Sequence, residues 1–200
     1  MKKIAVLLSG RGSNFMSIKK AVDEGKINGE IAVVISNKAD AKGLEFAKDS
    51  DLNAVFVNPK DFEGREAYDR ELIRILNEKG VDLVCLAGFM RIISPAFVKA
   101  FQNRIINIHP SLLPSFKGLD GQRQALEYGV KFSGCTVHFV DEEMDHGAII
   151  LQAVVPVNQT DTEDSLSAKI LKEEHRIYPE AVALFCDDRI RVEGRRVFID

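Results

Sequence analysis

Tryptophan is absent from the 200-residue sequence and cysteine is rare, since only Cys85, Cys135 and Cys186 occur and they lie far apart. An odd number of widely spaced cysteines argues against a disulfide framework and is typical of a reducing compartment. We expect no secretion signal, because the first apolar run covers only Ile4 to Leu8, whereas a signal peptide needs about 7–15 apolar residues. We therefore expect a cytoplasmic protein.

Long hydrophobic runs and an excess of charge of one sign are also absent. No stretch approaches the about 18 apolar residues of a membrane span, and the formal net charge is only −3. A weak overall charge gives no field that attracts nucleic acid or an anionic membrane. The basic cluster RIRVEGRR, residues 189–196, is the one local exception, and a solvated hairpin explains it. We expect no nucleic-acid partner and no membrane.

Metal-binding patterns are missing as well. The four histidines are His109, His138, His146 and His175, and none stands in an H-E-x-x-H motif or in a zinc-like pairing with cysteine. Two histidines and a carboxylate could hold a non-heme iron, but nothing in the spacing indicates such a triad. We expect no metal.

Alternation of apolar runs with helical patterns is the main feature that is present. Hydrophobic residues make up 46% of the sequence and charged residues 28%, over a length that suits one domain. This alternation predicts a three-layer, Rossmann-like α/β fold around a mostly parallel, twisted sheet. Strands are expected at residues 3–9, 30–36, 53–58, 81–87 and 104–109, and helices at 15–25, 41–51, 65–80 and 94–101.

The second half of the sequence has a different pattern. After a helix at 121–129, two strands at 134–140 and 148–157 are joined by the acidic loop DEEMDHG, residues 141–147. So short a joint predicts a hairpin, and therefore an antiparallel extension of the sheet. A long helix is expected at 162–186, capped by Asp161 or Thr162, and Pro179 should kink or restart it. We expect one domain, residues 1–200, with two halves.

A glycine-containing turn, SGRGSN at residues 9–14, joins the first strand to the first helix. Glycines let backbone N–H groups approach an anion, and the start of a helix carries partial positive charge. The turn is not a dinucleotide fingerprint, because Phe15 stands where a third small residue is required, and the end of the second strand, SNKAD, lacks an acidic residue placed to bind a ribose diol. Without G-K-[ST] it is not a P-loop either. It suits a single phosphate, although a tight turn explains the same residues.

Asn107 and His109 interrupt the apolar strand RIINIH, residues 104–109, at its carboxyl end. Residues i and i+2 of a strand share a face, so the two side chains should project together. Ligands of open α/β sheets bind at the carboxyl ends of the strands. We expect this strand end to meet SGRGSN and the loop AGFMRI, residues 87–92, at one rim of the sheet.

The acidic loop is expected to return to the same rim and to bring Asp141 and Asp145 with it. A carboxylate near His109 favours the protonated imidazole. An amide and a protonated imidazole together suit a carbonyl oxygen that becomes an oxyanion, and no serine or cysteine is placed as in a catalytic triad. A turn before Gly147 explains Asp145 equally well from spacing alone.

Seven blocks between residues 3 and 185 occur together in one order: LLSGRGSN, SNKADAKGLE, REAYDRELI, LAGFMRIISPAFV, NIHPSLLPSFKG, HFVDEEMDHGAIILQ and EEHRIYP. In this order they resemble the phosphoribosylglycinamide formyltransferases, folate-dependent enzymes of purine synthesis. The resemblance implies transfer of a formyl group from 10-formyltetrahydrofolate, as co-substrate, to the amine of 5-phosphoribosyl-glycinamide. It implies a phosphate-binding half at about 1–100, a folate-binding and catalytic half at about 101–200, and a monomer or homodimer.

The same resemblance implies a role for individual residues. The catalytic residues are Asn107, His109 and Asp145. Phosphoribosyl-glycinamide is bound by Gly12, Ser13, Asn14 and Glu174, and the folate by Arg65, Met90, Arg91, Ile92, Ile93, Asn107 and Asp141. Some relatives carry histidine where this chain has Asp120, so no role is expected for that side chain.

Three alternatives remain. A 10-formyltetrahydrofolate hydrolase would use the same folate but deliver the formyl group to water; such relatives carry a further N-terminal domain, whereas the first strand is expected here from residue 3. A nicotinamide-dependent oxidoreductase is opposed by Phe15. A non-catalytic phosphate-binding module would explain SGRGSN but leave Asn107, His109 and Asp145 without a purpose.

Overall fold

The computed structural model describes all residues from 1 to 200. The main sheet contains β1 (Lys2–Leu8), β2 (Gly29–Ser36), β3 (Ala54–Phe56), β4 (Leu83–Leu86), β5 (Ile105–His109), β6 (Phe132–Phe139) and β7 (Ile149–Pro156). The helices are α1 (Ser13–Asp23), α2 (Lys42–Asp49), the 3-10 helix η1 (Pro59–Asp61), α3 (Gly64–Glu78), α4 (Pro95–Ala100), α5 (Gly121–Tyr128) and α6 (Glu163–Cys186). A separate hairpin consists of β8 (Ile190–Glu193) and β9 (Arg196–Ile199).

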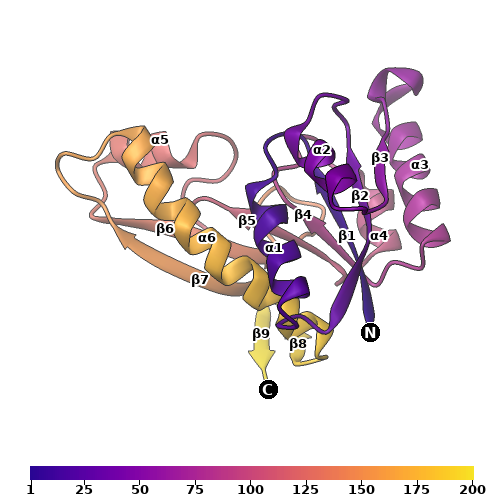
Figure 1. Ribbon diagram of the computed structural model, residues 1–200. Coiled ribbons are helices and arrows are strands. Elements are labelled where there is room, and N and C mark those ends of the chain that lie inside the picture. Colours follow the sequence, from indigo (N-terminus) through magenta and orange to yellow (C-terminus); the bar gives the residue numbers. More distant parts are fainter.

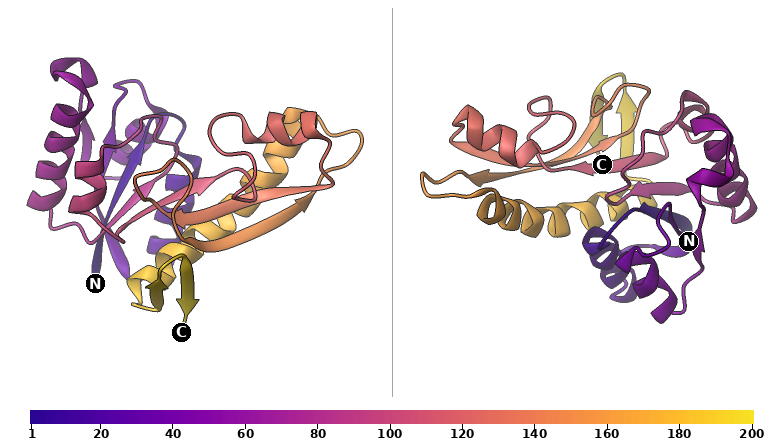
Figure 2. Two further views of the ribbon diagram at one scale, coloured as in Figure 1. Left: turned by 180° about the vertical axis from the view of Figure 1, so that it is seen from behind. Right: turned by 90° about the horizontal axis from the view of Figure 1, so that it is seen from above.

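The seven strands form one sheet in the order β3-β2-β1-β4-β5-β6-β7, which confirms the predicted architecture (Figure 1). Strands β1 to β5 pair in parallel, whereas β6 is antiparallel to both β5 and β7. The antiparallel part extends away from the parallel part and carries α6 along one face (Figure 2). The predicted hairpin of β6 and β7 is therefore confirmed, and a single sheet runs through both halves.

Two hydrophobic cores lie on the two faces of the sheet. Ile4, Val6 and Leu8 of β1 belong to the core beneath α1, α2 and α6, while Ala5 and Leu7 belong to the core beneath α3 and α4. All five side chains are fully buried. A strand covered on both faces needs a continuous apolar run rather than an alternating one, and this explains the uninterrupted hydrophobic start of the sequence.

Helix α6 begins with a capping box and continues without a break. Thr162 Oγ1 accepts a hydrogen bond from Ser165 N at 3.2 Å, and Ser165 Oγ accepts one from Thr162 N at 3.0 Å. A kink or a restart is expected from the sequence at Pro179; α6 is one helix through that residue, so it does not restart there. Interior proline costs about 3 kcal/mol, and burial of the nearby Ile177 and Val182, at about 1.5–3 kcal/mol each, offsets it. Neither α6 nor any shorter helix is both long and apolar enough to cross a membrane.

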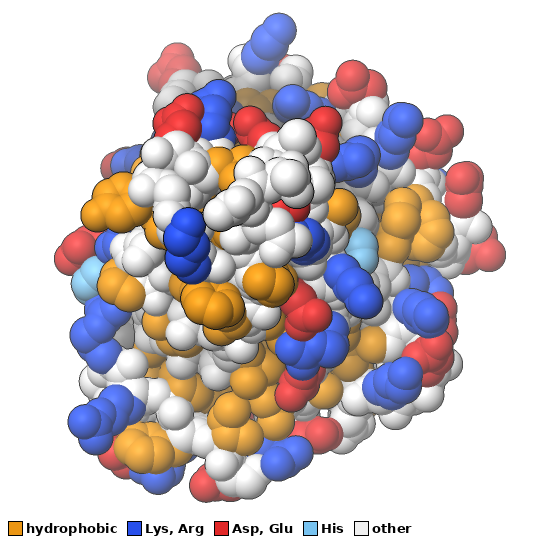
Figure 3. All heavy atoms as spheres, turned by 90° about the vertical axis from the view of Figure 1, so that its left-hand side faces the viewer, with side chains coloured by type: hydrophobic (Ala, Val, Ile, Leu, Met, Phe, Trp, Pro, Cys, Tyr) orange, Lys and Arg blue, Asp and Glu red, His pale blue; other side chains and the backbone are white.

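The end of the molecule formed by α5, β6 and β7 has a mixed surface. Figure 3 shows side chains of both charge signs interspersed around hydrophobic patches on this end. Tyr128, Phe132 and Val154 from these elements are among the exposed large hydrophobic side chains.

The carboxyl ends of β1, β4 and β5 are adjacent, so the loops that follow them meet at one rim. Ser9, after β1, donates its backbone N–H to Gly88 O at 3.0 Å and accepts a hydrogen bond on Oγ from Met90 N at 2.8 Å. The loops SGRGSN and AGFMRI are thus joined directly, which confirms that they converge.

The acidic loop takes a path that differs from the prediction. In the antiparallel register His109 pairs with Thr136 and Ile106 with Phe139, so the loop leaves β6 beside Ile105, at the amino end of β5. It then folds back over the face of the sheet, where Asp145 reaches His109. The reason is that β6 runs antiparallel to β5. A loop that follows an antiparallel strand starts at the opposite edge of the sheet from the loops that follow the parallel strands.

Candidate active site

Strand β5 presents Asn107 and His109 on one face, as predicted. The intervening Ile106 and Ile108 belong to the core beneath α6, and side chains alternate between the two faces of a strand. Asn107 and His109 therefore point to the opposite face. The imidazole is almost completely buried, with 5% of His109 exposed, and Asn107 is half-buried.

The two ring nitrogens of His109 both face oxygen atoms. Nε2 lies 2.8 Å from the carbonyl oxygen of Phe116, and because a carbonyl only accepts, Nε2 must carry the proton of this hydrogen bond. Nδ1 lies 3.5 Å from Asp145 Oδ2. Acceptors on both sides suit a doubly protonated ring, which is the form that the oxyanion hypothesis requires.

Asp145 lies at the centre of the cluster. Its Oδ2 accepts a hydrogen bond from Gly118 N at 2.8 Å, and its Oδ1 lies 3.8 Å from His138 Nε2. Asp145 adopts a φ of 48°, a left-handed conformation that costs about 1–3 kcal/mol for a residue other than glycine. A Cβ on Gly147 would lie 1.8 Å from Phe139 O, so only glycine fits there. Asp145 is both the turn residue before Gly147 and a partner of His109.

His138 is a member of the cluster that sequence reasoning did not identify. It stands opposite Asn107 in the register of β5 and β6, and its Nε2 lies 3.3 Å from Asn107 Nδ2. Since the amide nitrogen donates, Nε2 accepts, and Nδ1 donates to Phe139 O at 2.8 Å. Burial lowers the pKa of His138, and the Phe139 carbonyl opposes this only in part. A neutral imidazole thus orients the Asn107 amide, and a polar residue inside an apolar strand was its only signal.

Acid is expected to destabilise the protein through His138. Because burial holds its folded pKa below the ordinary value of 6.5, the unfolded chain binds a proton where the folded chain does not. The free energy of unfolding should therefore fall as pH decreases below about 6.5, by at most about 1.4 kcal/mol per pH unit for one proton. When the free energy of unfolding is measured by urea denaturation at several pH values in this range, it should depend less steeply on pH in His138→Gln. Burial also lowers the pKa of His175, so His175→Gln measures how much that histidine contributes to the pH dependence. If the free energy of unfolding of His138→Gln depends on pH as steeply as that of the original protein, the prediction is wrong.

The residues expected to bind phosphate lie at the start of α1. Gly12 has a φ of 76°, and an added Cβ would lie 2.7 Å from the Cα of Gly43, so this position requires glycine. Ser13 and Asn14 form the first turn of α1, which has no side-chain cap. The free backbone N–H groups of such a turn favour an anion.

Glu174 of α6 meets this turn directly, because α1 and α6 pack side by side on the same face of the sheet. Asn14 Nδ2 donates a hydrogen bond to Glu174 Oε2 at 2.8 Å, and Asn14 Oδ1 is buried without a partner. Burial raises the pKa of Glu174, while the Asn14 hydrogen bond and the charge of His109 lower it in part. The structure therefore brings together the predicted residues Gly12, Ser13, Asn14 and Glu174, and places Glu174 within electrostatic reach of His109.

The residues expected to bind folate lie beside the same rim. Arg91 stacks over the ring of Tyr68 at 4.6 Å, and Ser94 N donates to Asp69 Oδ2 at 2.5 Å. These contacts join the segment at 90–94 to the first turns of α3, where Arg65 lies exposed. Met90 and Ile92 are exposed apolar side chains, and Ile93 is partly buried.

Asp141 is tied to its own loop. Its Oδ2 lies 2.8 Å from His146 Nδ1, and its Oδ1 accepts a hydrogen bond from Glu143 N at 3.0 Å. Asp120 pairs with Arg123 at the start of α5.

This arrangement of groups suits acyl transfer without a protein nucleophile. The Asn107 amide and the His109 imidazole share one face of β5, Asp145 adjoins the imidazole, and the start of α1, which has no side-chain cap, lies at the same rim. Hydrogen-bond donors of this kind stabilise the oxyanion of a tetrahedral intermediate, and a carboxylate can move a proton between two nitrogen atoms.

Comparison with known proteins gives a consistent result. Residues 2–182 match the formyl transferase family. The chain is 47% identical over 197 residues to phosphoribosylglycinamide formyltransferase of Escherichia coli, covering 98% of this chain and 93% of that protein. It is 50% identical over 185 residues to the trifunctional purine biosynthetic protein adenosine-3 of Drosophila melanogaster, but the match spans 92% of this chain and only 14% of the insect protein.

A solved structure extends the likeness to the fold. The crystal structure of glycinamide ribonucleotide transformylase 1 from Symbiobacterium toebii superposes with a TM-score of 0.98 at 54% identity, covering 100% of this chain and 94% of that one.

Proposed function

The chain belongs to the formyl transferase family, and on that premise we propose that it transfers the formyl group of 10-formyltetrahydrofolate to the amine of 5-phosphoribosyl-glycinamide in de novo purine (IMP) biosynthesis. Members of the family use formyl-tetrahydrofolate as co-substrate. The observation that carries the proposal is the juxtaposition of Asn107, His109 and Asp145 at the rim that also holds the anion-binding start of α1.

The proposed reaction is a direct attack of the glycinamide nitrogen on the formyl carbon. The Asn107 amide and the protonated His109 ring stabilise the oxyanion of the tetrahedral intermediate. The formyl oxygen would take the place that the Phe116 carbonyl holds beside His109 Nε2. The carbon–nitrogen bond to the folate then breaks, and its electron pair returns to the folate nitrogen.

Asp145 carries the proton that this exchange requires. The attacking amine must lose one proton, and the departing folate nitrogen must gain one. A carboxylate that faces His109 at 3.5 Å supports the imidazolium and relays that proton, directly or through water. The products are the N-formylated amine and tetrahydrofolate, and the protein ends in its initial protonation state.

The two substrates are proposed to bind from different sides of the cluster. Gly12, Ser13 and Asn14 would hold the single phosphate, and Glu174 would contact the glycinamide part. The exposed apolar side chains of Met90 and Ile92 offer a surface to the flat pteridine, together with Arg65, Arg91 and Ile93. Asn107 would contact the folate at its formyl group, and Asp141 would border the slot. The division into a phosphate-binding half, about 1–100, and a folate-binding and catalytic half, about 101–200, stays a proposal, as do the monomeric or homodimeric state and the lack of a metal.

Glu174→Gln is expected to weaken use of phosphoribosyl-glycinamide. The variant keeps the shape of the side chain but loses its charge, and a hydrogen bond to a charged group contributes about 1.5–3 kcal/mol. kcat/KM for this substrate should therefore fall by about 10- to 100-fold, with KM for the folate unchanged. Burial raises the pKa of Glu174, so ionisation costs folding stability as pH rises past its ordinary pKa of 4.5. Glu174→Gln should accordingly be more stable than the original protein at pH 8, and an equal loss for both substrates would argue against this role.

One assay separates the proposed transferase from its alternatives. The protein is incubated with 10-formyltetrahydrofolate, with and without phosphoribosyl-glycinamide, while tetrahydrofolate and free formate are measured. A transferase releases tetrahydrofolate only when the amine is present, and it forms no formate. Formate release without the amine would identify a 10-formyltetrahydrofolate hydrolase, and the absence of any turnover would favour a phosphate-binding module. Metal analysis of the active protein tests the expectation that it needs none.

A further inference from the structure

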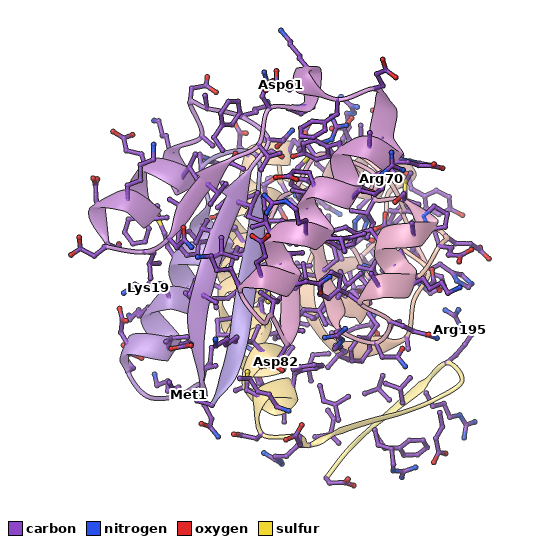
Figure 4. All side chains as sticks on the ribbon, turned by 90° about the vertical axis from the view of Figure 1, so that its right-hand side faces the viewer. Met1, Lys19, Asp61, Arg70, Asp82 and Arg195 are labelled. Atoms are coloured by element: carbon purple, nitrogen blue, oxygen red, sulfur yellow. The ribbon has the colours of Figure 1, made fainter.

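The hairpin of β8 and β9 contacts the acidic loop through a single arginine. Ile190, Val192 and Val197 pack their apolar side chains against the main core, which fixes the hairpin to the body of the protein. Arg195 lies in the turn between the two strands and points from the tip of the hairpin toward the main body (Figure 4). The side chain that it reaches is His146, which directly follows Asp145 in the sequence.

Arg195 holds His146 by both its backbone and its ring. One terminal nitrogen, Nη2, donates to the carbonyl oxygen of His146 at 2.6 Å. The other, Nη1, lies 2.9 Å from Nε2 and 3.3 Å from Nδ1 of the ring, so the guanidinium lies against the imidazole. Such a two-point contact constrains both the position of the peptide and the orientation of the side chain.

The His146 ring also forms a hydrogen bond with Asp141, so it links Arg195 to that carboxylate. A carboxylate only accepts hydrogen bonds, so His146 Nδ1 donates to Asp141 Oδ2 at 2.8 Å. Nε2 is then free to accept from Arg195. The chain Arg195–His146–Asp141 thus spans the acidic loop from its last turn to its first residue, on either side of Asp145.

We propose that Arg195 is a positioning residue that holds the acidic loop in the conformation in which Asp145 meets His109. The proposal rests on the proposed function for the role of Asp145, but its structural part does not depend on that function. Arg195 touches neither the reacting groups nor the rim, so it acts only through His146 and the loop.

The hydrogen bonds within the loop centre on Asp141, and the middle of the loop has little support of its own. Glu142, Glu143 and Met144 are exposed, and Asp145 is held in a left-handed conformation that the backbone does not favour. The contact between Asp145 and His109 Nδ1 is 3.5 Å, so a small displacement of the loop would lose it. A misplacement of about 1 Å is enough to lower a rate severalfold or more.

The test compares Arg195→Ala with Arg196→Ala and Arg195→Lys. Arg196 is the next residue and is also exposed, so its replacement removes the same charge without touching His146. Hydrogen–deuterium exchange of the unliganded proteins is measured in the loop at 141–147 and in β6. In parallel, kcat and both KM values for formyl transfer are measured, and the double variant Arg195→Ala/His146→Ala is compared with the two single variants.

Arg195→Ala is expected to speed exchange in the loop but not in β6, and to lower kcat by about fivefold, the scale of one exposed charged contact. KM for phosphoribosyl-glycinamide should not change, Arg196→Ala should behave as the original protein, and Arg195→Lys should recover part of kcat. The kcat of the double variant should be no lower than that of the less active single variant, because both substitutions remove the same contact between Arg195 and His146. Unchanged loop exchange, or equal effects of Arg195→Ala and Arg196→Ala, would overturn the proposal. If the original protein shows no formyl transfer, the proposed function fails, whereas loop exchange still decides whether Arg195 holds the loop.

Discussion

Replacing His109 by alanine is expected to lower kcat for formyl transfer by about 10²–10³-fold, the usual effect of removing one oxyanion donor. In the proposed mechanism the protonated ring donates to the oxyanion; in the structure Asp145 faces one ring nitrogen and the Phe116 carbonyl the other. Loss of the ring removes an interaction that exists only once negative charge develops on the formyl oxygen. The two KM values should change much less than kcat, because neither substrate in its ground state carries that charge.

A loss of structure must be separated from this loss of chemistry. His109 is almost completely buried and donates a hydrogen bond to Phe116, so the substitution should also reduce the free energy of unfolding by about 1–3 kcal/mol. Thermal unfolding and circular dichroism show whether the variant is folded at the assay temperature. Asn107→Ala should give a similar loss of kcat, as the second donor to the same oxygen. If both folded variants keep kcat within tenfold of the original protein, the oxyanion mechanism is wrong.

The parts of the site that depend on local rules could be predicted from the sequence. Asn107 and His109 share a face because side chains alternate along any strand. The convergence of SGRGSN with AGFMRI follows from parallel strands that end at one edge, and Ser9 and Met90 are indeed hydrogen-bonded. The start of the long helix at Asp161 or Thr162 follows from the preference of such residues for the N-cap position, and the structure places the cap at Thr162. Each of these inferences uses only neighbouring residues and a general geometry.

The parts that depend on pairing between distant segments could not be predicted. His138 faces Asn107 only because of the antiparallel register of β5 and β6, and a shift by one residue would turn it to the other face. The acidic loop starts at the amino end of β5 for the same topological reason. The contact of Arg195 with His146 joins residues 49 positions apart, whereas the basic cluster at 189–196 by itself indicates only a solvated hairpin. Pro179 does not restart α6, because burial of the helix outweighs the local effect of the proline.

Asp145→Asn is expected to reduce kcat by about 10²–10⁴-fold, the range in which a lost general acid–base group acts. Asparagine is nearly the same shape and its Oδ1 can still accept from Gly118 N, so the loop should keep its conformation. What disappears is the negative charge beside His109 and the ability to carry a proton between the two nitrogens. Both deficits affect the transition state, and KM for either substrate should stay within a few-fold of the original value.

The matched control for this variant is Glu142→Gln in the same loop. Glu142 is exposed, and its replacement removes one carboxylate charge without reaching His109, so kcat should be unchanged. Measuring both the steady-state kcat and the single-turnover rate distinguishes slow chemistry from slow product release. Equal losses of kcat in Asp145→Asn and Glu142→Gln would show that only the net charge of the loop matters. Because Arg195 acts through Asp145, adding Arg195→Ala to Asp145→Asn should lower kcat no further. A further fivefold loss of kcat would mean that the hairpin supports a different group of the site. An unchanged kcat would mean that Arg195 affects the reaction only through the contact of Asp145 with His109.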